Sequence, residues 1–106
     1  MSSKRPAMVG SVVRSVVAPL LRGCPQDCGI VSLTEVEVSA DLSYATCYIS
    51  ALLHPDQALA FLTSHIRELQ TGLGQALQIH RTPRIRFRID PRSERGARID
   101  RLLEGS

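Results

Sequence analysis

Three segments of the chain alternate apolar and polar side chains with the period of two that is typical of β-strands. Residues 30–39 alternate valines with glutamates, and residues 44–52 alternate small or aliphatic side chains with tyrosine, threonine and serine. Only the turn-like residues 40–43 separate these two segments, which predicts an antiparallel hairpin. Residues 84–90 alternate isoleucine and phenylalanine with arginine, and therefore predict a third strand with one apolar and one cationic face.

Residues 9–21 repeat valines and leucines at spacings of three and four, which predicts an amphipathic helix. The basic residues before this segment, and the sequence Leu21-Arg22-Gly23-Cys24, also give it a faint likeness to a signal peptide with a lipoprotein cleavage site. Arg14 interrupts the apolar stretch and Arg22 is unsuited to such a site, so we expect a helix that remains part of the domain. No apolar run approaches the roughly 18 residues that span a bilayer, so we expect no membrane partner.

A second helical pattern covers residues 57–79, where leucines and an isoleucine form one stripe. Asp56 is expected to cap its start. Gly72 and Gly74 lie inside this pattern, and each costs about 1 kcal/mol relative to alanine in a helix. We therefore predict a break or a close approach at Gly72–Gly74, and two helices in place of one.

The last apolar stripe, in residues 93–103, predicts a short closing helix. The predicted order is thus α-ββ-αα-β-α. A strand reached through helices usually lies parallel to its neighbour, so the sheet should be mixed. We predict a small α+β domain with a three-stranded mixed sheet and helices packed on one face.

Charge is distributed unevenly along the 106 residues, whose net charge is +3. Residues 1–23 carry four basic side chains and no acidic one, and residues 24–80 carry six acidic side chains against Arg67 alone. Residues 81–106 carry eight arginines and four acidic side chains. Twelve of the thirteen basic residues are arginine, whose planar fork suits phosphate, so the basic ends indicate an anionic polymer as partner. A solvated face paired with the acidic middle is the alternative reading of charge alone.

Composition argues against several other classes of protein. Aromatic residues make up 4% and tryptophan is absent, so the core should be aliphatic and base stacking cannot be the main binding device. Three cysteines are too few for a disulfide scaffold and fit a reducing compartment. Cys24 and Cys28 have no second ligand pair at a spacing that suits zinc, so we expect no metal and no cofactor. Cys47 should be a small buried residue.

No pattern of catalytic residues stands out in the chain. His54, His65 and His80 are scattered without an evident carboxylate or nucleophile partner. Glu35 and Glu37 share one strand face, but the strand alternates in the ordinary way. Phosphate loops, nucleophile elbows and dinucleotide fingerprints are absent from the sequence. We therefore expect a protein that is not an enzyme and has no small-molecule substrate.

The arginine face of residues 84–90 is the strongest candidate for a binding surface. Three guanidinium groups on one rigid strand suit contacts with phosphates. The alternative is cross-strand pairing with Glu35 and Glu37, which contributes only about 0–1 kcal/mol per exposed pair. The glycines at 72 and 74 permit close approach of the main chain to a phosphate, or a tight crossing of two helices.

Three segments, at the right order and spacing, carry a resemblance to a known family. They are a strand–turn–strand over residues 31–50 with the turn Val38-Ser-Ala-Asp-Leu42, a proline-led strand over 81–90 that ends in Asp90, and a closing segment over 93–103. Together they resemble the ribosome-binding factor A family over about residues 5–103. The resemblance implies one type II KH-like RNA-binding domain over 5–103, with short tails at 1–4 and 104–106.

The resemblance also implies a function. A cytoplasmic, monomeric assembly factor would bind free or immature small ribosomal subunits and their RNA, including its 5′ region, in late maturation and rRNA processing. A general KH-type RNA-binding or adaptor domain without ribosome specificity is the alternative. The residues expected to bind RNA are Arg67, Gly72, Gly74, Gln75, Arg81, Arg84, Arg86, Arg88, Arg92, Arg95 and Arg98.

The chain departs from the family pattern at two places. The small-x-glycine kink that the family has between its central helices would fall at His65-Ile66-Arg67, which has no glycine. We therefore expect the kink to have moved to Gly72-Leu73-Gly74, or the helix to run straighter. Thr46 stands where the family often has lysine in its second strand.

Overall fold

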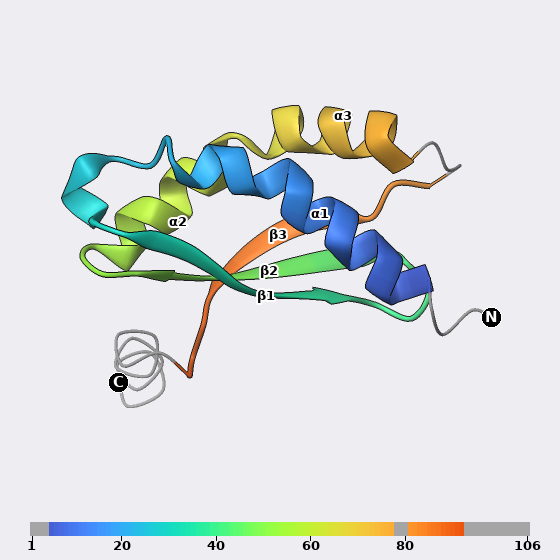
Figure 1. Cartoon of the computed structure of the whole chain (residues 1–106), viewed down its shortest axis with the longest axis horizontal. Helices are drawn as coiled ribbons and strands as arrows, with labels where there is room; N and C mark the ends of the chain where they lie inside the picture. Colours follow the sequence, from blue (N-terminus) through green and yellow to red (C-terminus); the bar gives the residue numbers. More distant parts are fainter. Residues whose placement is uncertain (1–4, 78–80, 93–106) are drawn as a thin grey trace.

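The computed structural model describes residues 5–77 and 81–92, which form three α-helices, a 3-10 turn and three strands (Figure 1). The predicted closing helix over 93–103 lies outside the described residues. Up to that point the element order agrees with the predicted α-ββ-αα-β. The elements are α1 (Arg5–Leu21), η2 (Gln26–Cys28), β1 (Val31–Val38), β2 (Tyr44–Ala51), α2 (Pro55–Ser64), α3 (Ile66–Leu77) and β3 (Arg84–Ile89).

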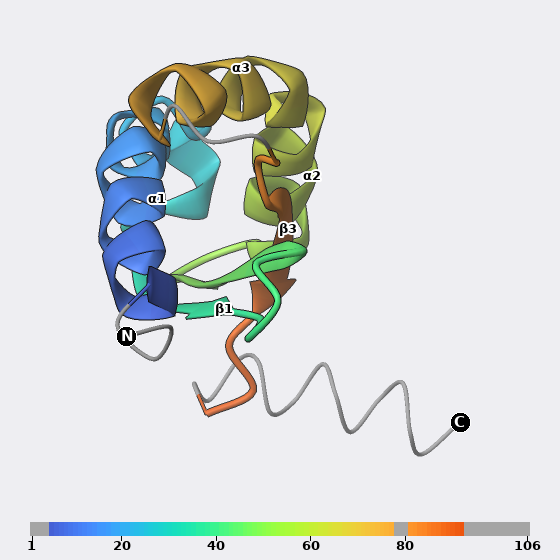
Figure 2. The same ribbon diagram turned by 90° about the vertical axis from the view of Figure 1, so that its right-hand side faces the viewer.

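The sheet has the strand order β1-β2-β3. β1 and β2 form the predicted antiparallel hairpin, and β3 pairs with β2 in the parallel direction, so the prediction of a mixed sheet is confirmed. All three α-helices lie on the same side of this sheet, as the view along the strands shows (Figure 2). The described part of the chain therefore has two layers, with one face of the sheet left uncovered by helices.

A β-bulge in β1 keeps the apolar side chains of that strand on the helix side. The register shifts between Leu33 and Glu35, and Thr34 is the extra residue. Without the shift, Leu33 and Val36 would point to opposite faces because they are three positions apart. Both are half-buried in the structure. Arg14 of α1 donates a hydrogen bond to the Leu33 carbonyl at 3.1 Å and so ties the helix to the strand at the bulge.

The core lies between the sheet and the helices, and it is aliphatic as the composition predicts. Helices supply fully buried valines and leucines, and β2 supplies Cys47 and Ile49 at 0% exposure. Phe87 of β3 is the one aromatic ring among the buried residues that the structure describes. The strand faces predicted from alternation are confirmed, because Ala45, Cys47 and Ile49 point inward together with Ile85 and Phe87.

The two predicted central helices are present, but the break between them lies at His65, so a break at Gly72–Gly74 is wrong and the alternative of a close approach there is confirmed. α2 ends at Ser64 and α3 begins at Ile66. The backbone N–H of His65 bonds to the Leu62 carbonyl, which leaves the Phe61 carbonyl without its helical partner. The Ser64 hydroxyl donates to that carbonyl at 2.6 Å, and His65 Nδ1 lies 2.9 Å from it. Two polar side chains thus stabilise an interruption at the place where the family's glycine kink was expected.

The two glycines serve packing inside a continuous helix. A Cβ at Gly72 would lie 3.6 Å from Val16 of α1, and one at Gly74 would lie 3.3 Å from the Thr82 hydroxyl. Gly72 therefore lies at the crossing of α1 and α3, and Gly74 lies against the segment that leads into β3. The expected helix cap is also different: His54 precedes α2 at φ 47°, with Pro55 as the first helical residue, and Asp56 lies within the first turn.

Gly72→Ala should raise the free energy of unfolding by about 0.5–1 kcal/mol and leave RNA affinity unchanged. The new methyl group has ordinary contact distance to Val16, and the unfolded chain loses entropy. Urea unfolding of the variant measures this. Gly74→Ala is the matched control, and its gain should be smaller because Thr82 must move. A loss of RNA affinity in Gly72→Ala would instead assign the Gly72 backbone to a phosphate contact.

Candidate nucleic-acid interface

The face of the sheet opposite the helices carries the arginine stripe. We call it the open face, and its residues on β2 and β3 are Tyr44, Thr46, Tyr48, Arg84, Arg86 and Arg88. The parallel register sets Tyr44 beside Arg84, Thr46 beside Arg86 and Tyr48 beside Arg88. Alternation along β3 therefore exposes all three guanidinium groups on one rigid strand, about 6.5 Å apart along it.

Arg86 is held in place by two neighbours on β2. Its Nε donates to the Thr46 hydroxyl at 2.8 Å, and its guanidinium carbon lies 4.7 Å from the centre of the Tyr44 ring. Thr46 is only 5% exposed, although it lies on the open face, because Arg86 covers it. Both contacts lower the conformational entropy that Arg86 would lose on binding a phosphate.

The alternative role of the stripe, pairing with Glu35 and Glu37, is not seen in the structure. Within residues 5–77 and 81–92, the ion pairs found join Arg92 to Asp90 and to Glu35, and none involves the stripe. β2 separates β1 from β3, so Glu37 and Arg86 lie two strands apart, about 9–10 Å between backbones. The three arginines of the stripe therefore remain available to an external anion.

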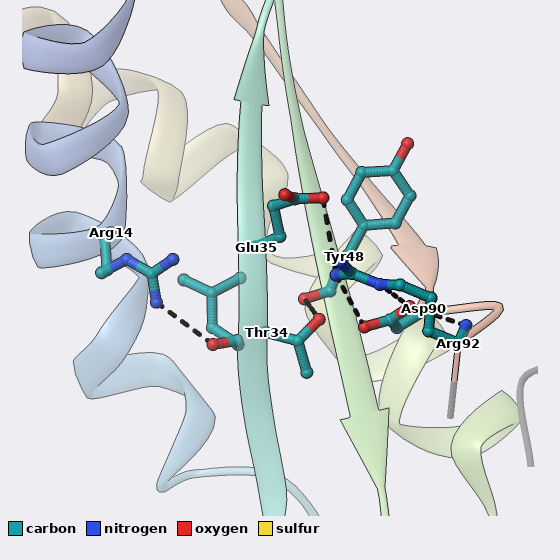
Figure 3. A network of polar contacts seen from close by, with 7 residues as sticks. Arg14, Thr34, Glu35, Tyr48, Asp90 and Arg92 are labelled. Carbon is teal, nitrogen blue, oxygen red and sulfur yellow. Dashed lines mark hydrogen bonds and ion pairs between the residues drawn. The ribbon is translucent and has the colours of Figure 1, made fainter. Parts of the chain in front are cut away.

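Arg92 differs from the stripe because it is bound within the protein (Figure 3). Its Nε and one terminal nitrogen donate to the two oxygens of Asp90 at 3.0 and 3.1 Å, and its backbone N–H donates to the same carboxylate. The same terminal nitrogen lies 3.5 Å from Glu35 Oε2. Asp90 is 4% exposed, and its own N–H continues the sheet by bonding to the Ile49 carbonyl. This network fastens the chain where it leaves β3.

Hydrogen bonds from Arg92, and then from Thr34, hold the pKa of Asp90 well below its ordinary value. Because the folded-state pKa is depressed, the stabilisation is present above the unfolded pKa of about 3.9 and is lost as pH falls below it. Asp90→Asn should lower the free energy of unfolding at pH 7 by about 1–2 kcal/mol. The loss is not larger because the partner, Arg92, is largely exposed and solvent screens its charge. The variant should also lose less stability than the wild type between pH 4 and pH 2.5.

Thermal unfolding followed at several pH values measures both effects. Glu37→Gln is the matched control, because Glu37 is exposed on β1 and makes no ion pair within the described ranges. Wild-type and Asp90→Asn proteins that lose stability in parallel below pH 4 would contradict the assignment of Asp90.

The structure separates the remaining predicted residues into groups. Arg67 and Gln75 are exposed on α3, and α3 lies in the helix layer, on the other side of the sheet from the open face (Figure 2). Arg81 is exposed just before β3 and extends the stripe at its start. Arg95 and Arg98 lie outside the described residues. The predicted site is thus centred on β3, with Gly72 and Gly74 inside the helix packing.

Sequence reasoning missed Gln70, which protects the free edge of β3. Its side-chain nitrogen donates to the Pro83 carbonyl at 2.9 Å, and its oxygen accepts from the Ile85 N–H at 2.7 Å. The amide thereby occupies the place of a neighbouring strand at a sheet edge. Sequence reasoning also missed Tyr44 and Tyr48 as neighbours of the arginines, although alternation along β2 placed both tyrosines on its polar face.

The part of the chain that the structure describes contains neither a metal-binding cluster nor a membrane-spanning helix. No group of three or more histidine, cysteine or acidic side chains there is arranged to hold a metal ion. None of the helices described is long and apolar enough to cross a membrane. Within residues 5–77 and 81–92, the open face with its arginines is the strongest candidate for binding chemistry.

The element order, the mixed sheet and the cationic open face define a small KH-like domain of the RNA-binding class. The profile of the family described as ribosome-binding factor A matches residues 5–103. A ribosome-binding factor A from Gloeobacter violaceus is 37% identical over 98% of this chain and 87% of its own. One from Rubrobacter xylanophilus is 39% identical over 91% of this chain and 75% of its own. The chain belongs to the ribosome-binding factor A family.

A homology model of the Thermus thermophilus ribosome binding factor A, fitted into the cryo-EM map of a 30S–RbfA complex, has a similar fold. The TM-score is 0.67 at 21% identity, over 80% of this chain and 94% of that one. The prediction of a KH-like α+β fold is therefore confirmed.

Proposed function

We propose that this protein is an assembly factor of the small ribosomal subunit. It binds free or immature subunits through their ribosomal RNA, including the 5′ region, and promotes late maturation and rRNA processing. Family membership over residues 5–103 supports this function, as does the Thermus thermophilus relative placed on a 30S subunit. The protein acts as a single KH-like domain, as a monomer in the cytoplasm, without catalysis.

The observation that carries the proposal is the row of three arginines without carboxylate partners among the described residues. Phosphate contacts set position and orientation on folded RNA and supply most of the affinity. A preformed strand presents the guanidinium groups without rearrangement, so little order must be created on binding. The factor would hold a late intermediate until the RNA reaches its mature arrangement, and then leave.

Co-sedimentation with ribosomal fractions at two salt concentrations tests the function. We expect the purified protein on free small subunits and their precursors, absent from translating ribosomes, and released at high salt. No association with small subunits at low salt would overturn the proposal. Equal binding to unrelated RNA would favour a general RNA-binding domain, and binding to translating ribosomes would favour a permanent ribosomal protein.

A further inference from the structure

A hollow of about 430 Å³ opens where the β1–β2 turn meets the start of β3. Its walls include Tyr44 and Asp41 from the hairpin, and Arg81 and Arg84 from the β3 side. The volume lies within the range of small-molecule sites. The hollow adjoins the arginine stripe, because Arg84 belongs to both.

The hairpin side of the hollow is preorganised by hydrogen bonds. The Ser39 hydroxyl donates to Asp41 at 2.8 Å and accepts from the N–H groups of Ser43 and Tyr44, each at 3.0 Å. These bonds hold Leu42, another lining residue, at φ 62°, a conformation that is costly for a side chain with a Cβ. The Ser43 carbonyl in turn accepts from the Arg84 N–H at 2.9 Å, which fixes the turn against β3.

The lining favours a base over a bare phosphate as occupant. Asp41 is ionised at neutral pH, and hydrogen bonds from Ser43 and Ser39 lower its pKa further. Its negative charge partly offsets the positive charges of Arg81 and Arg84 toward an anion inside the hollow. Tyr44 is 41% exposed, and the guanidinium carbon of Arg86 already lies 4.7 Å from the centre of its ring. Arg81 and Arg84 can bind the phosphates on either side of an inserted base.

We infer that this hollow binds a single unpaired nucleotide of the RNA, with its base stacked on Tyr44 and its flanking phosphates on Arg81 and Arg84. The inference rests on the proposed function, since it assumes RNA on the open face. One base on one ring adds selectivity for an unpaired position, while the arginines supply the bulk of the affinity.

The test uses two RNA hairpins that differ only by one bulged 2-aminopurine, bound to the full chain at fixed salt. The bulged hairpin should bind about tenfold more tightly than the fully paired one, and binding should quench the fluorescence of the probe. Tyr44→Ala should remove this preference and the quenching, and should weaken the paired hairpin only by the loss of its contact with Arg86. Tyr44→Phe should retain both, because the ring remains.

Tyr48→Ala is the matched control, as Tyr48 lies on the same face of β2, outside the hollow lining. Circular dichroism checks the folding of each variant, and Arg81→Ala, in an exposed segment, gives a second reading if Tyr44→Ala does not fold. We expect Arg81→Ala to reduce the preference for the bulge about threefold or more.

Equal binding of the two hairpins, or equal effects of Tyr44→Ala and Tyr48→Ala, would overturn the nucleotide site and leave the assembly function standing. If the wild-type protein does not bind small subunits in a salt-dependent way, the proposed function itself is overturned. Quenching by wild-type protein that persists in Tyr44→Ala would place the unpaired base elsewhere and also reject the site.

Discussion

Replacing Arg84, Arg86 and Arg88 together by alanine is expected to weaken binding to small ribosomal subunits about a hundredfold or more at low salt. It should also reduce the slope of log affinity against log salt by about 2–3, because each phosphate contact contributes about 0.7–0.9 to that slope. Filter binding to small subunits over a range of salt concentrations measures both quantities. Exposed side chains on the open face are being removed, so the fold should persist.

Two control variants make this result specific. Changing the three arginines to lysine should keep the salt slope, because the charges remain, but lower affinity, because the bidentate fork is lost. Arg22→Ala with Arg67→Ala removes two exposed arginines outside the open face and should change affinity only weakly. If that double variant loses as much as the triple one, the helix side binds the RNA and the open face does not.

Leu73→Ala should have the largest effect on stability, a loss of about 2–5 kcal/mol in the free energy of unfolding. Leu73 is fully buried in α3, between the two packing glycines, and belongs to the core with Val13 and Val17 of α1. Truncation leaves a cavity that the close helix crossing at Gly72 prevents from collapsing. Urea unfolding at constant temperature gives the change in midpoint and slope.

Gln75→Ala is the control for Leu73→Ala. It removes an exposed side chain two residues further along the same helix, so its effect should stay within about 0.5 kcal/mol. A Leu73→Ala variant as stable as Gln75→Ala would show that α3 is not packed as described. The placement of Gly72 and Gly74 in the helix crossing would then be wrong as well.

The fate of the arginines shows why charge counting alone cannot define the site. Arg92 belongs to the same basic C-terminal region as the stripe, yet Asp90 and Glu35 neutralise it. Arg84, Arg86 and Arg88 have no such partner among the described residues, since β2 lies between them and the glutamates of β1. An Arg92→Ala variant should therefore destabilise the end of β3, where the contacts with Asp90 and Glu35 are lost, and leave the salt slope of RNA binding nearly unchanged.

Much of the fold could be predicted because alternation is a local property. Residues two apart on a strand share a face wherever that strand lies, so the inward Ile85 and Phe87 and the outward arginines followed from spacing. The hairpin followed from the short connection between β1 and β2, and the parallel third strand from its helical connection. Family resemblance added the KH-like fold and the ribosomal partner.

The location of the helix break was predicted wrongly because helix propensity considers each residue alone. Gly72 and Gly74 are poor helix formers, and together they cost about 2 kcal/mol relative to alanine. However, α1 and the segment that leads into β3 occupy the space beside them, and this tertiary packing outweighs the helix propensity. Ser64 and His65 make the break because their side chains bond to the freed Phe61 carbonyl. No spacing rule in the sequence indicates that arrangement.

The sequence by itself determined the strands, their inward and outward faces, the aliphatic core and the row of arginines, since each depends on the local period of the chain. Tertiary structure alone decided which arginine is neutralised, how Gln70 covers the edge of β3, and how Tyr44 comes to lie beside Arg84 and Arg86. Apart from Asp90 and Arg92, which are two positions apart, these pairings join residues 13 to 57 positions apart. They depend on strand register and helix placement, which only the packing of the whole domain establishes.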